Sequence, residues 1–258
     1  MKKKIYIDPG HGGGSIGATY KGRKEQDDTL RLAKKVRDYL VKQYEVEVKL
    51  SREGDTNPEI IARANEANAW GADYFISLHR NAIGPNKAKG VEVWVYSKVS
   101  KTGGTYKKAE RILELTCKAT GFANRGTKLG APSYSDFGVN SLTMMDSCLL
   151  EVGFIDSDAD NKTFDSKFDA MAQAIALGLA DAVEAEVKDE APKAENKTLY
   201  RVQVGAFYSK ENAEAYATKA KAAGFEAFVT VAGDVDGDGK VTAADARTAL
   251  RQSVGLED

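Results

Sequence analysis

The sequence predicts an α/β fold, a twisted and mostly parallel sheet flanked by helices, followed by a small α+β C-terminal domain. Short segments rich in Val, Ile, Tyr and Leu alternate with longer segments whose apolar residues recur at helical spacing. Strands that alternate with helices are typical of a parallel sheet covered by helices. The second domain is predicted from a change of composition near residue 185, where large apolar side chains become scarce.

Five segments are expected to be strands, because they are rich in β-branched and aromatic residues and most are bounded by Gly, Asp or Asn. Helical patterns lie between them. The dipeptide Asn57-Pro58 predicts an N-cap followed by a proline in the first helical turn. The expected strands are 3–8, 45–50, 73–79, 90–97 and 148–154, and the expected helices are 26–42, 58–70, 105–120 and 167–186.

The C-terminal quarter divides from the rest at residues 187–197, which are polar and charged apart from Val187. Such a segment buries too little surface to order itself, so we interpret it as a linker. The predicted domains are therefore residues 1–186 and residues 198–258. In the smaller one we expect strands at 198–207 and 226–232 and helices at 209–223 and 243–254.

Overall composition excludes several classes of protein. The net charge of −1 gives no general attraction for nucleic acid, and no apolar run approaches the roughly 20 residues of a membrane-spanning helix. The basic N-terminus lacks an apolar segment, so we expect no signal peptide. Cys117 and Cys148 form no metal-binding spacing and are expected to be buried free thiols, although the sequence alone leaves a disulfide open.

The two histidines of the chain follow or end predicted strands. His11 follows the first strand, and His79 ends the third. Because ligands of open α/β sheets bind beyond the carboxyl ends of strands, the two imidazoles are expected to converge on one metal ion. A catalytic zinc site usually takes three protein ligands and leaves one position to water. Glu25, just before the first long helix, is the best third ligand, although a glutamate there could equally complement the helix dipole.

Glu151 lies inside the apolar segment LLEVGF, which is expected to be a strand. A carboxylate there must find a partner or suffer a raised pKa, unless strand alternation points it to solvent. A raised pKa suits a general acid/base that works near neutral pH. We therefore expect Glu151 to be catalytic.

A glycine-rich segment, GGGSIG at residues 12–17, offers a different interpretation. It fits GxGxxG after a strand, the pattern of dinucleotide-binding enzymes. However, the predicted helix begins well after the last glycine, which removes the phosphate site at a helix N-terminus. This interpretation would predict a bound nucleotide and no metal.

The motifs IYIDPGHGGGSIGA, RANEANAWGADYFISLHRNA, NRGTKLG and LLEVGFIDSDAD, together with Glu25, resemble the zinc-dependent N-acetylmuramoyl-L-alanine amidases of the amidase_3 type. The resemblance covers about residues 3–184. It implies a single α/β domain that cleaves the amide between N-acetylmuramic acid and the L-alanine of peptidoglycan. By position, it makes His11, Glu25 and His79 the zinc ligands and Glu151 the catalytic glutamate. Asp146 stands where this family tends to have proline, so the local loop path is expected to differ.

The implied mechanism is a hydrolysis in which zinc polarises the scissile carbonyl and acidifies the attacking water. Glu151 takes the water proton and delivers it to the leaving amine. The alternative is a non-catalytic wall-binding protein with the amidase fold, which would lack one of the four key residues. The expected context is a phage endolysin or a sporulation autolysin, made in the cytoplasm and reaching the wall after release or secretion.

The C-terminal domain resembles two known modules. LYRVQVGAFYSKENAEAYATKAKAAGFEAFV is similar to the first half of a SPOR domain, a module that binds peptidoglycan, and DVDGDGKVTAAD is similar to a dockerin half with its calcium loop. Four carboxylates at loop spacing favour a bound calcium over a solvated turn. The open edge of so small a sheet also suggests pairing of two chains into a homodimer. The predicted calcium ligands are Asp234, Asp236, Asp238, Asp245 and the backbone carbonyl of Lys240.

Overall fold

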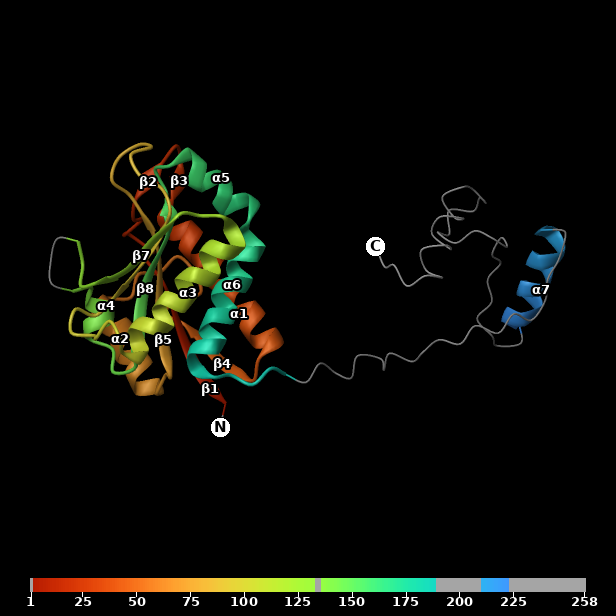
Figure 1. Ribbon diagram of the computed structural model, residues 1–258, viewed down its shortest axis with the longest axis horizontal. Helices are drawn as coiled ribbons and strands as arrows, with labels where there is room; N and C mark the ends of the chain where they lie inside the picture. The colour runs from red at the N-terminus through yellow and green to blue at the C-terminus, as the bar shows by residue number, and fades with distance from the viewer. Residues whose placement is uncertain (1, 133–135, 189–209, 223–258) are drawn as a thin grey trace. The chain divides into compact units, whose positions relative to one another are not determined.

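The computed structural model describes residues 2–132, 136–188 and 210–222 (Figure 1). The chain divides into two compact units, Met1–Lys193 and Ala194–Asp258. The larger unit holds almost all of the described elements. In the described part of the chain, no helix is both long enough and apolar enough to cross a membrane.

A six-stranded sheet forms the middle layer of the larger unit, with the order β4-β1-β5-β8-β6-β7. Neighbouring strands are parallel except for β6 and β8, which are antiparallel. The predicted twisted, mostly parallel sheet is therefore confirmed. Its strands are β1 Lys3–Pro9, β4 Val46–Leu50, β5 Tyr74–Asn81, β6 Val91–Val95, β7 Asn124–Leu129 and β8 Asp146–Phe154.

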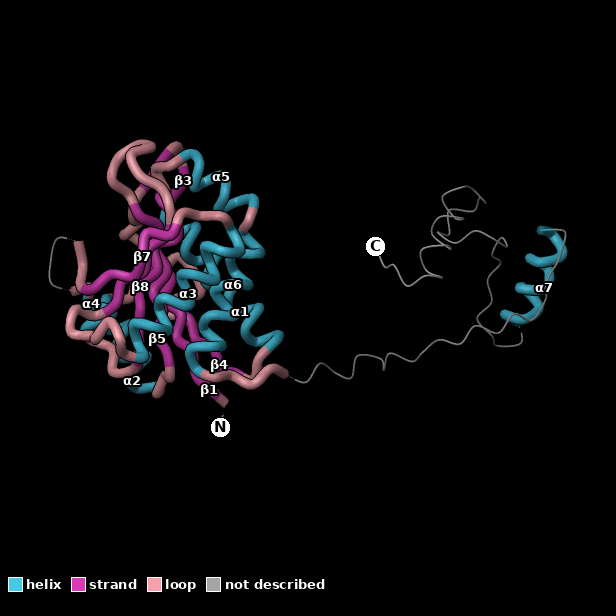
Figure 2. The backbone as a smooth tube through the Cα atoms, in the orientation of Figure 1, coloured by secondary structure: helices cyan, strands magenta, loops and turns pink. Residues whose placement is uncertain are grey.

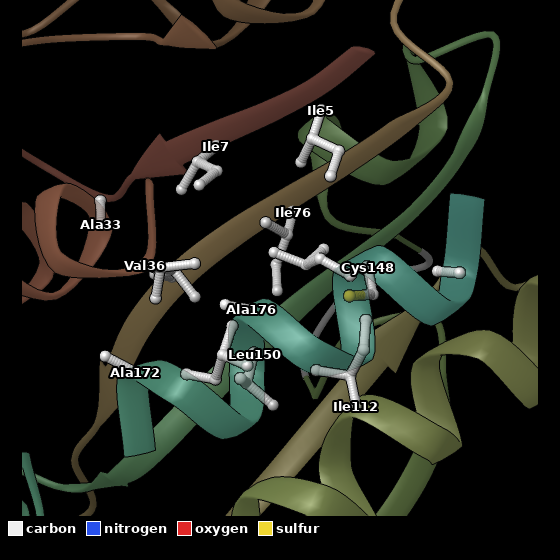
Figure 3. Close-up of a cluster of buried hydrophobic side chains, with 14 of the residues drawn as sticks. Ile5, Ile7, Ala33, Val36, Ile76, Ile112, Cys148, Leu150, Ala172 and Ala176 are labelled. Carbon is white, nitrogen blue, oxygen red and sulfur yellow. The ribbon is translucent and has the colours of Figure 1, made fainter. Parts of the chain in front are cut away.

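Helices cover both faces of this sheet (Figure 2). Three long helices, α1 Glu25–Gln43, α3 Gly104–Thr120 and α6 Phe168–Val183, pack on one face. Figure 3 shows the resulting core, in which Ile76 and Leu150 of the sheet meet Ala172 and Ala176 of α6. The other face is covered by α2 Ile60–Trp70 and α4 Gly138–Ser141, over a smaller core that contains Phe75 and Leu149. The remaining helix of this unit is α5 Asp158–Ser166.

Most predicted elements occur within a few residues of their predicted ends, but some differ. The structure adds β7, α4 and a short hairpin of β2 Thr19–Tyr20 and β3 Arg23–Lys24. The predicted helix 167–186 is α6, and α5 precedes it. The predicted cap at Asn57 is wrong, because α2 begins after Glu59 and the Asn57 side chain instead accepts a hydrogen bond from Arg63.

The beginning of the predicted linker is hydrogen-bonded to the larger unit. The backbone N–H of Lys188 donates to Gln43, and the N–H of Glu45 donates to Glu186. Cys117 and Cys148 are both free thiols. In the smaller unit, α7 Lys210–Ala222 lies within the predicted helix 209–223. The predicted strands 198–207 and 226–232, helix 243–254 and the whole calcium loop lie outside the described residues.

Candidate metal centre

His11 lies in the loop after β1 and has a left-handed backbone conformation, with a φ of 63°. This conformation is uncommon for a residue other than glycine and has to be held by its surroundings. Two buried arginines do so by donating to successive backbone carbonyls. Arg63 donates to the carbonyls of Pro9 and His11, and Arg52 donates to those of Pro9 and Gly10.

The arginine that holds His11 is itself fixed by a buried carboxylate. Asp8, which is 1% exposed, accepts a hydrogen bond from Arg63 Nη1 at 2.6 Å and others from Ser51 and Ser77. The pairing offsets part of the free-energy cost of burying the two charges. The path of the His11 loop is therefore set by a charged network beneath it.

His79 lies near the carboxyl end of β5, and Glu25 is the first residue of α1. Their approach depends on two small residues. A Cβ added at Gly10 would lie 2.3 Å from the His79 ring, and one added at Gly17 would lie 2.6 Å from Glu25 Oε2. Glycine at these two positions therefore leaves the space into which the side chains converge.

The three side chains meet at one point, as the positions of the histidines suggested. Glu25 Oε2 lies 3.2 Å from His11 Nε2, and Glu25 Oε1 lies 3.0 Å from His79 Nδ1. One ligand atom from each residue lies within 4.8 Å of the others. Glu25 is 4% exposed, whereas the histidine side chains are 27% and 21% exposed, so the group opens to solvent on the histidine side.

Backbone amides fix the orientation of the Glu25 carboxylate. The N–H of Ala18 donates to Oε2 at 2.8 Å, and the N–H of Arg80 donates to Oε1 at 2.9 Å. Burial by itself would raise the pKa of Glu25, but the hydrogen bonds with the two histidines outweigh it and hold that pKa well below its usual range. Burial lowers the pKa of His79, whereas its hydrogen bond with Glu25 raises that pKa to about 9.

Glu151 lies on β8 directly opposite His79 on β5. Its Oε2 is buried and has no hydrogen-bond partner among the described residues. Burial raises its pKa to about 7, despite the favourable charge of His79. Glu151, His11, Glu25 and His79 all line one cleft of about 540 Å³. The site therefore holds a carboxyl group that can both accept and donate a proton near neutral pH.

Sequence reasoning missed the residues that build the site without lining its centre, namely Asp8, Arg63, Gly10 and Gly17. All four lie inside motifs that carry the amidase resemblance, but nothing in the sequence assigned them a role in supporting the ligands. One wall of the cleft is apolar and was not predicted either. It is formed by Pro58, Ile60, Phe137 and Val139, from the segments around α2 and α4.

An α/β sheet with two histidines, a glutamate and a separate buried carboxyl group has the residue set of a metallohydrolase. Comparison with known proteins agrees. Residues 5–181 match the family Amidase_3, N-acetylmuramoyl-L-alanine amidase. Residues 169–252 match the SPOR domain. The chain therefore belongs to the N-acetylmuramoyl-L-alanine amidase family, and its resemblance to both families is confirmed.

Individual relatives support this assignment along most of the chain. The chain is 38% identical over 227 residues to the N-acetylmuramoyl-L-alanine amidase CwlM of Bacillus licheniformis, covering 88% of this chain and 84% of that protein. It is 39% identical, with the same coverage, to a sporulation-specific N-acetylmuramoyl-L-alanine amidase of Bacillus subtilis. The crystal structure of an N-acetylmuramoyl-L-alanine amidase from Clostridium difficile 630 matches 71% of this chain and 97% of that chain, at 30% identity and a TM-score of 0.65. The expectation that the chain is an enzyme of this class is confirmed.

Proposed function

We propose that this protein is a zinc-dependent hydrolase that cleaves the amide between N-acetylmuramic acid and L-alanine in peptidoglycan. The observation that carries the proposal is the convergence of three ligand atoms within 4.8 Å beside a buried, unpartnered carboxyl oxygen of Glu151. In this proposal His11, Glu25 and His79 hold the metal. Glu151 is the general acid/base.

The residues fit a catalytic zinc ion by their chemistry. Two imidazoles and one carboxylate are a known ligand set of zinc hydrolases, and they leave one position open. The Glu25 carboxylate is already ionised and oriented by two backbone N–H groups. A bound zinc ion would supply positive charge to the scissile carbonyl and lower the pKa of the attacking water.

Glu151 moves the proton in this proposal. Its ionised form accepts a proton as water oxygen bonds to the carbonyl carbon, and its protonated form then donates that proton to the departing nitrogen. The carbon–nitrogen bond breaks, which leaves a carboxyl group on the muramic acid and a free amine on L-alanine. A pKa of about 7 allows both roles at neutral pH.

A non-catalytic wall-binding protein with the same fold is the alternative. A protein that only binds the wall would need no ionisable group opposite His79. In such a protein the buried carboxyl oxygen of Glu151 would only lower the stability of the fold. The two expected biological contexts both have relatives. One is the sporulation-specific amidase already named, and the other is an endolysin of Bacillus phage SPP1, 37% identical over 204 residues.

For the C-terminal part we propose wall binding through the SPOR-like segment, with residues 187–197 as the linker between domains 1–186 and 198–258. The SPOR match supports this role. Calcium binding at residues 234–245 and homodimer formation through this part also remain predictions. Sedimentation of the full chain and of residues 1–193 with sacculi would test wall binding, because equal binding would contradict a wall-binding tail.

Digestion of purified peptidoglycan tests the proposed reaction. Mass analysis should show new L-alanine amino termini without new reducing sugars, in the presence of one zinc per chain. A chelator and His79→Ala should each abolish both zinc and cleavage. As a matched control, Lys118→Ala changes an exposed residue of α3 that does not line the cleft and should leave both unchanged. A His79→Ala enzyme with normal cleavage would refute the assignment.

A further inference from the structure

A row of titratable residues crosses four neighbouring strands on the cleft face of the sheet. His79 of β5 lies opposite Glu151 of β8, and Glu151 lies opposite Glu92 of β6. On β7, Arg125 continues the row at the irregularity between the pairs Val91–Asn124 and Val93–Thr127. The row therefore runs from the candidate metal ligands to the edge of the sheet, and its outer half has no role in the reaction proposed above.

Glu92 is the centre of the outer half. It is only 2% exposed, and both of its carboxylate oxygens are saturated with donors. Asn81 Nδ2 and Trp94 Nε1 donate to Oε1 at 2.9 and 3.1 Å. Arg125 Nε and Lys128 Nζ donate to Oε2 at 2.7 and 2.6 Å. Glu92 is therefore a fixed anchor, with no lone pair left over for a substrate.

The two cations that share Glu92 have a different environment. The side chains of Arg125 and Lys128 are 34% and 32% exposed, so solvent reaches them while their anchor is buried. One carboxylate cannot neutralise two cations, and the cluster keeps a net positive charge. Each cation also lies over an aromatic ring, Arg125 over Phe154 and Lys128 over Trp94, which limits its movement. A positioned and partly exposed pair of cations is a suitable receptor for an anion.

We propose that Arg125 and Lys128, anchored by Glu92, form a subsite for a carboxylate carried by the peptide part of the substrate. The inference rests on the proposed function, because it assumes that the scissile amide lies at the candidate metal centre. Asn81 connects the two places. It lines the cleft, and its side chain contacts Glu92.

The sheet geometry gives the position of this carboxylate along the peptide. Neighbouring strands lie about 4.8 Å apart, and the two cations reach from β7 back to Glu92 on β6. Their charged groups therefore lie between about one and two strand spacings from Glu151, or about 5 to 10 Å. An extended peptide advances about 3.3 Å per residue. The carboxylate that reaches the cations therefore belongs to the second or third residue beyond the scissile amide. An amidase with this subsite distinguishes peptidoglycan with a free carboxylate from peptidoglycan amidated there.

A purely structural role for the cluster gives a different expectation. If Glu92, Arg125 and Lys128 only held β6 and β7 together, losing one cation would lower stability and slow every substrate equally. A subsite instead makes the loss depend on whether the substrate carries the carboxylate. The two explanations therefore separate when one variant is compared on paired substrates.

The experiment uses zinc-loaded full-length protein and three N-acetylmuramoyl tripeptides. One has all peptide carboxyls amidated, and the others carry one free carboxylate at the second or third residue. We expect the wild type to cleave one of the carboxylate substrates with a kcat/KM about tenfold above the amidated one, mainly through KM. Lys128→Met and Arg125→Gln should each lose most of this preference, measured within each variant as the ratio of kcat/KM on the carboxylate and amidated substrates. That ratio cancels any change in the acid/base function of Glu151, which is common to the three substrates. Lys118→Met is the matched control and should keep the preference.

Binding provides a second measurement that needs no turnover. Calorimetry with the Glu151→Gln protein and the tripeptides alone should show the same preference of about tenfold, lost when Lys128→Met is added. The subsite is overturned if the wild type shows no preference in either measurement, or if the variants weaken all substrates equally. Failure to cleave any of the three substrates, with carboxylate-dependent binding intact, would instead count against the proposed reaction.

Discussion

Replacing Gly17 with alanine tests how closely the candidate metal centre depends on a residue that carries no chemistry. Gly17 has a φ of +71°, and an added Cβ would lie 2.6 Å from Glu25 Oε2 and 2.7 Å from His11 Cδ2. Glu25 Oε2 would have to move by about 0.8 Å to reach the 3.4 Å of ordinary contact. Zinc–ligand distances tolerate about 0.2 Å, so we expect Gly17→Ala to lose zinc affinity by at least about tenfold.

The matched control is Gly22→Ala. Gly22 also has a left-handed φ, +81°, but an added Cβ there has nothing within 4 Å. Both substitutions carry the backbone cost of the left-handed conformation, roughly 1–2 kcal/mol, and only Gly17→Ala adds the contact with the metal ligands. Gly22→Ala therefore separates backbone strain from displacement of Glu25.

Two measurements decide the outcome. Urea unfolding in the presence of a chelator should show a similar loss of stability for both variants, and competition with a chromophoric chelator should show weakened zinc binding for Gly17→Ala alone. Equal zinc affinity in the two variants would refute the reasoning. It would show either that the loop around Gly17 shifts freely or that Glu25 is not a ligand.

Four further outcomes are expected. Glu151→Gln should bind zinc normally, but its turnover number should fall by a factor of about 10² to 10⁴. Zinc analysis and muropeptide kinetics would measure the two quantities. Because burial raises the Glu151 pKa from 4.5 to about 7, the metal-free protein should lose up to about 3 kcal/mol of stability as the pH rises from 4.5 through 7. Denaturant titrations of the wild type should show this loss of stability. The same titrations of Glu151→Gln should lack it, because the amide does not titrate. Arg63→Met should weaken zinc binding about 10- to 100-fold, because the His11 carbonyl loses its donor, whereas Arg37→Met on the exposed face of α1 should not. Calcium should raise the melting temperature of the C-terminal part of the full chain, and Asp236→Ala should remove the effect.

The sheet was largely predictable because its central strands carry strong patterns. β1, β5 and β8 are rich in Ile, Leu and Val and are buried on both faces, which makes their apolar runs nearly continuous. β7 was missed because it lies at the sheet edge. Its sequence NRGTKL has little apolar content, and its residues are exposed or partly exposed. The two-residue strands and α4 are too short for any periodicity to emerge.

The metal ligands were predictable for a different reason. Only two histidines exist in the chain. His11 follows β1 and His79 lies near the end of β5, and these neighbouring parallel strands end at the same edge of the sheet. The residues that support the metal ligands were not predictable, because two of them are arginines that are buried rather than exposed. Arg52 and Arg63 are each 4% exposed, although arginine is usually a surface residue. Their burial is explained by the carbonyls and the carboxylate that they bind, which the sequence separates by more than 40 residues.

The contrast between Glu151 and Glu92 shows why one of two opposite carboxyl groups is the candidate acid/base. They lie directly across from each other on β8 and β6, so the charge of Glu92 disfavours ionisation of Glu151. Burial tends to raise the pKa of Glu92, but Lys128 and Arg125 outweigh it and lower that pKa. Within the described ranges, no group donates a hydrogen bond to Glu151 Oε2, so burial raises the pKa of Glu151. Pairs of groups whose surroundings push their pKa values apart mark the division of roles at acid/base sites. The same two cations that would receive the substrate carboxylate therefore keep Glu92 ionised, and the ionised Glu92 helps Glu151 to hold a proton at neutral pH.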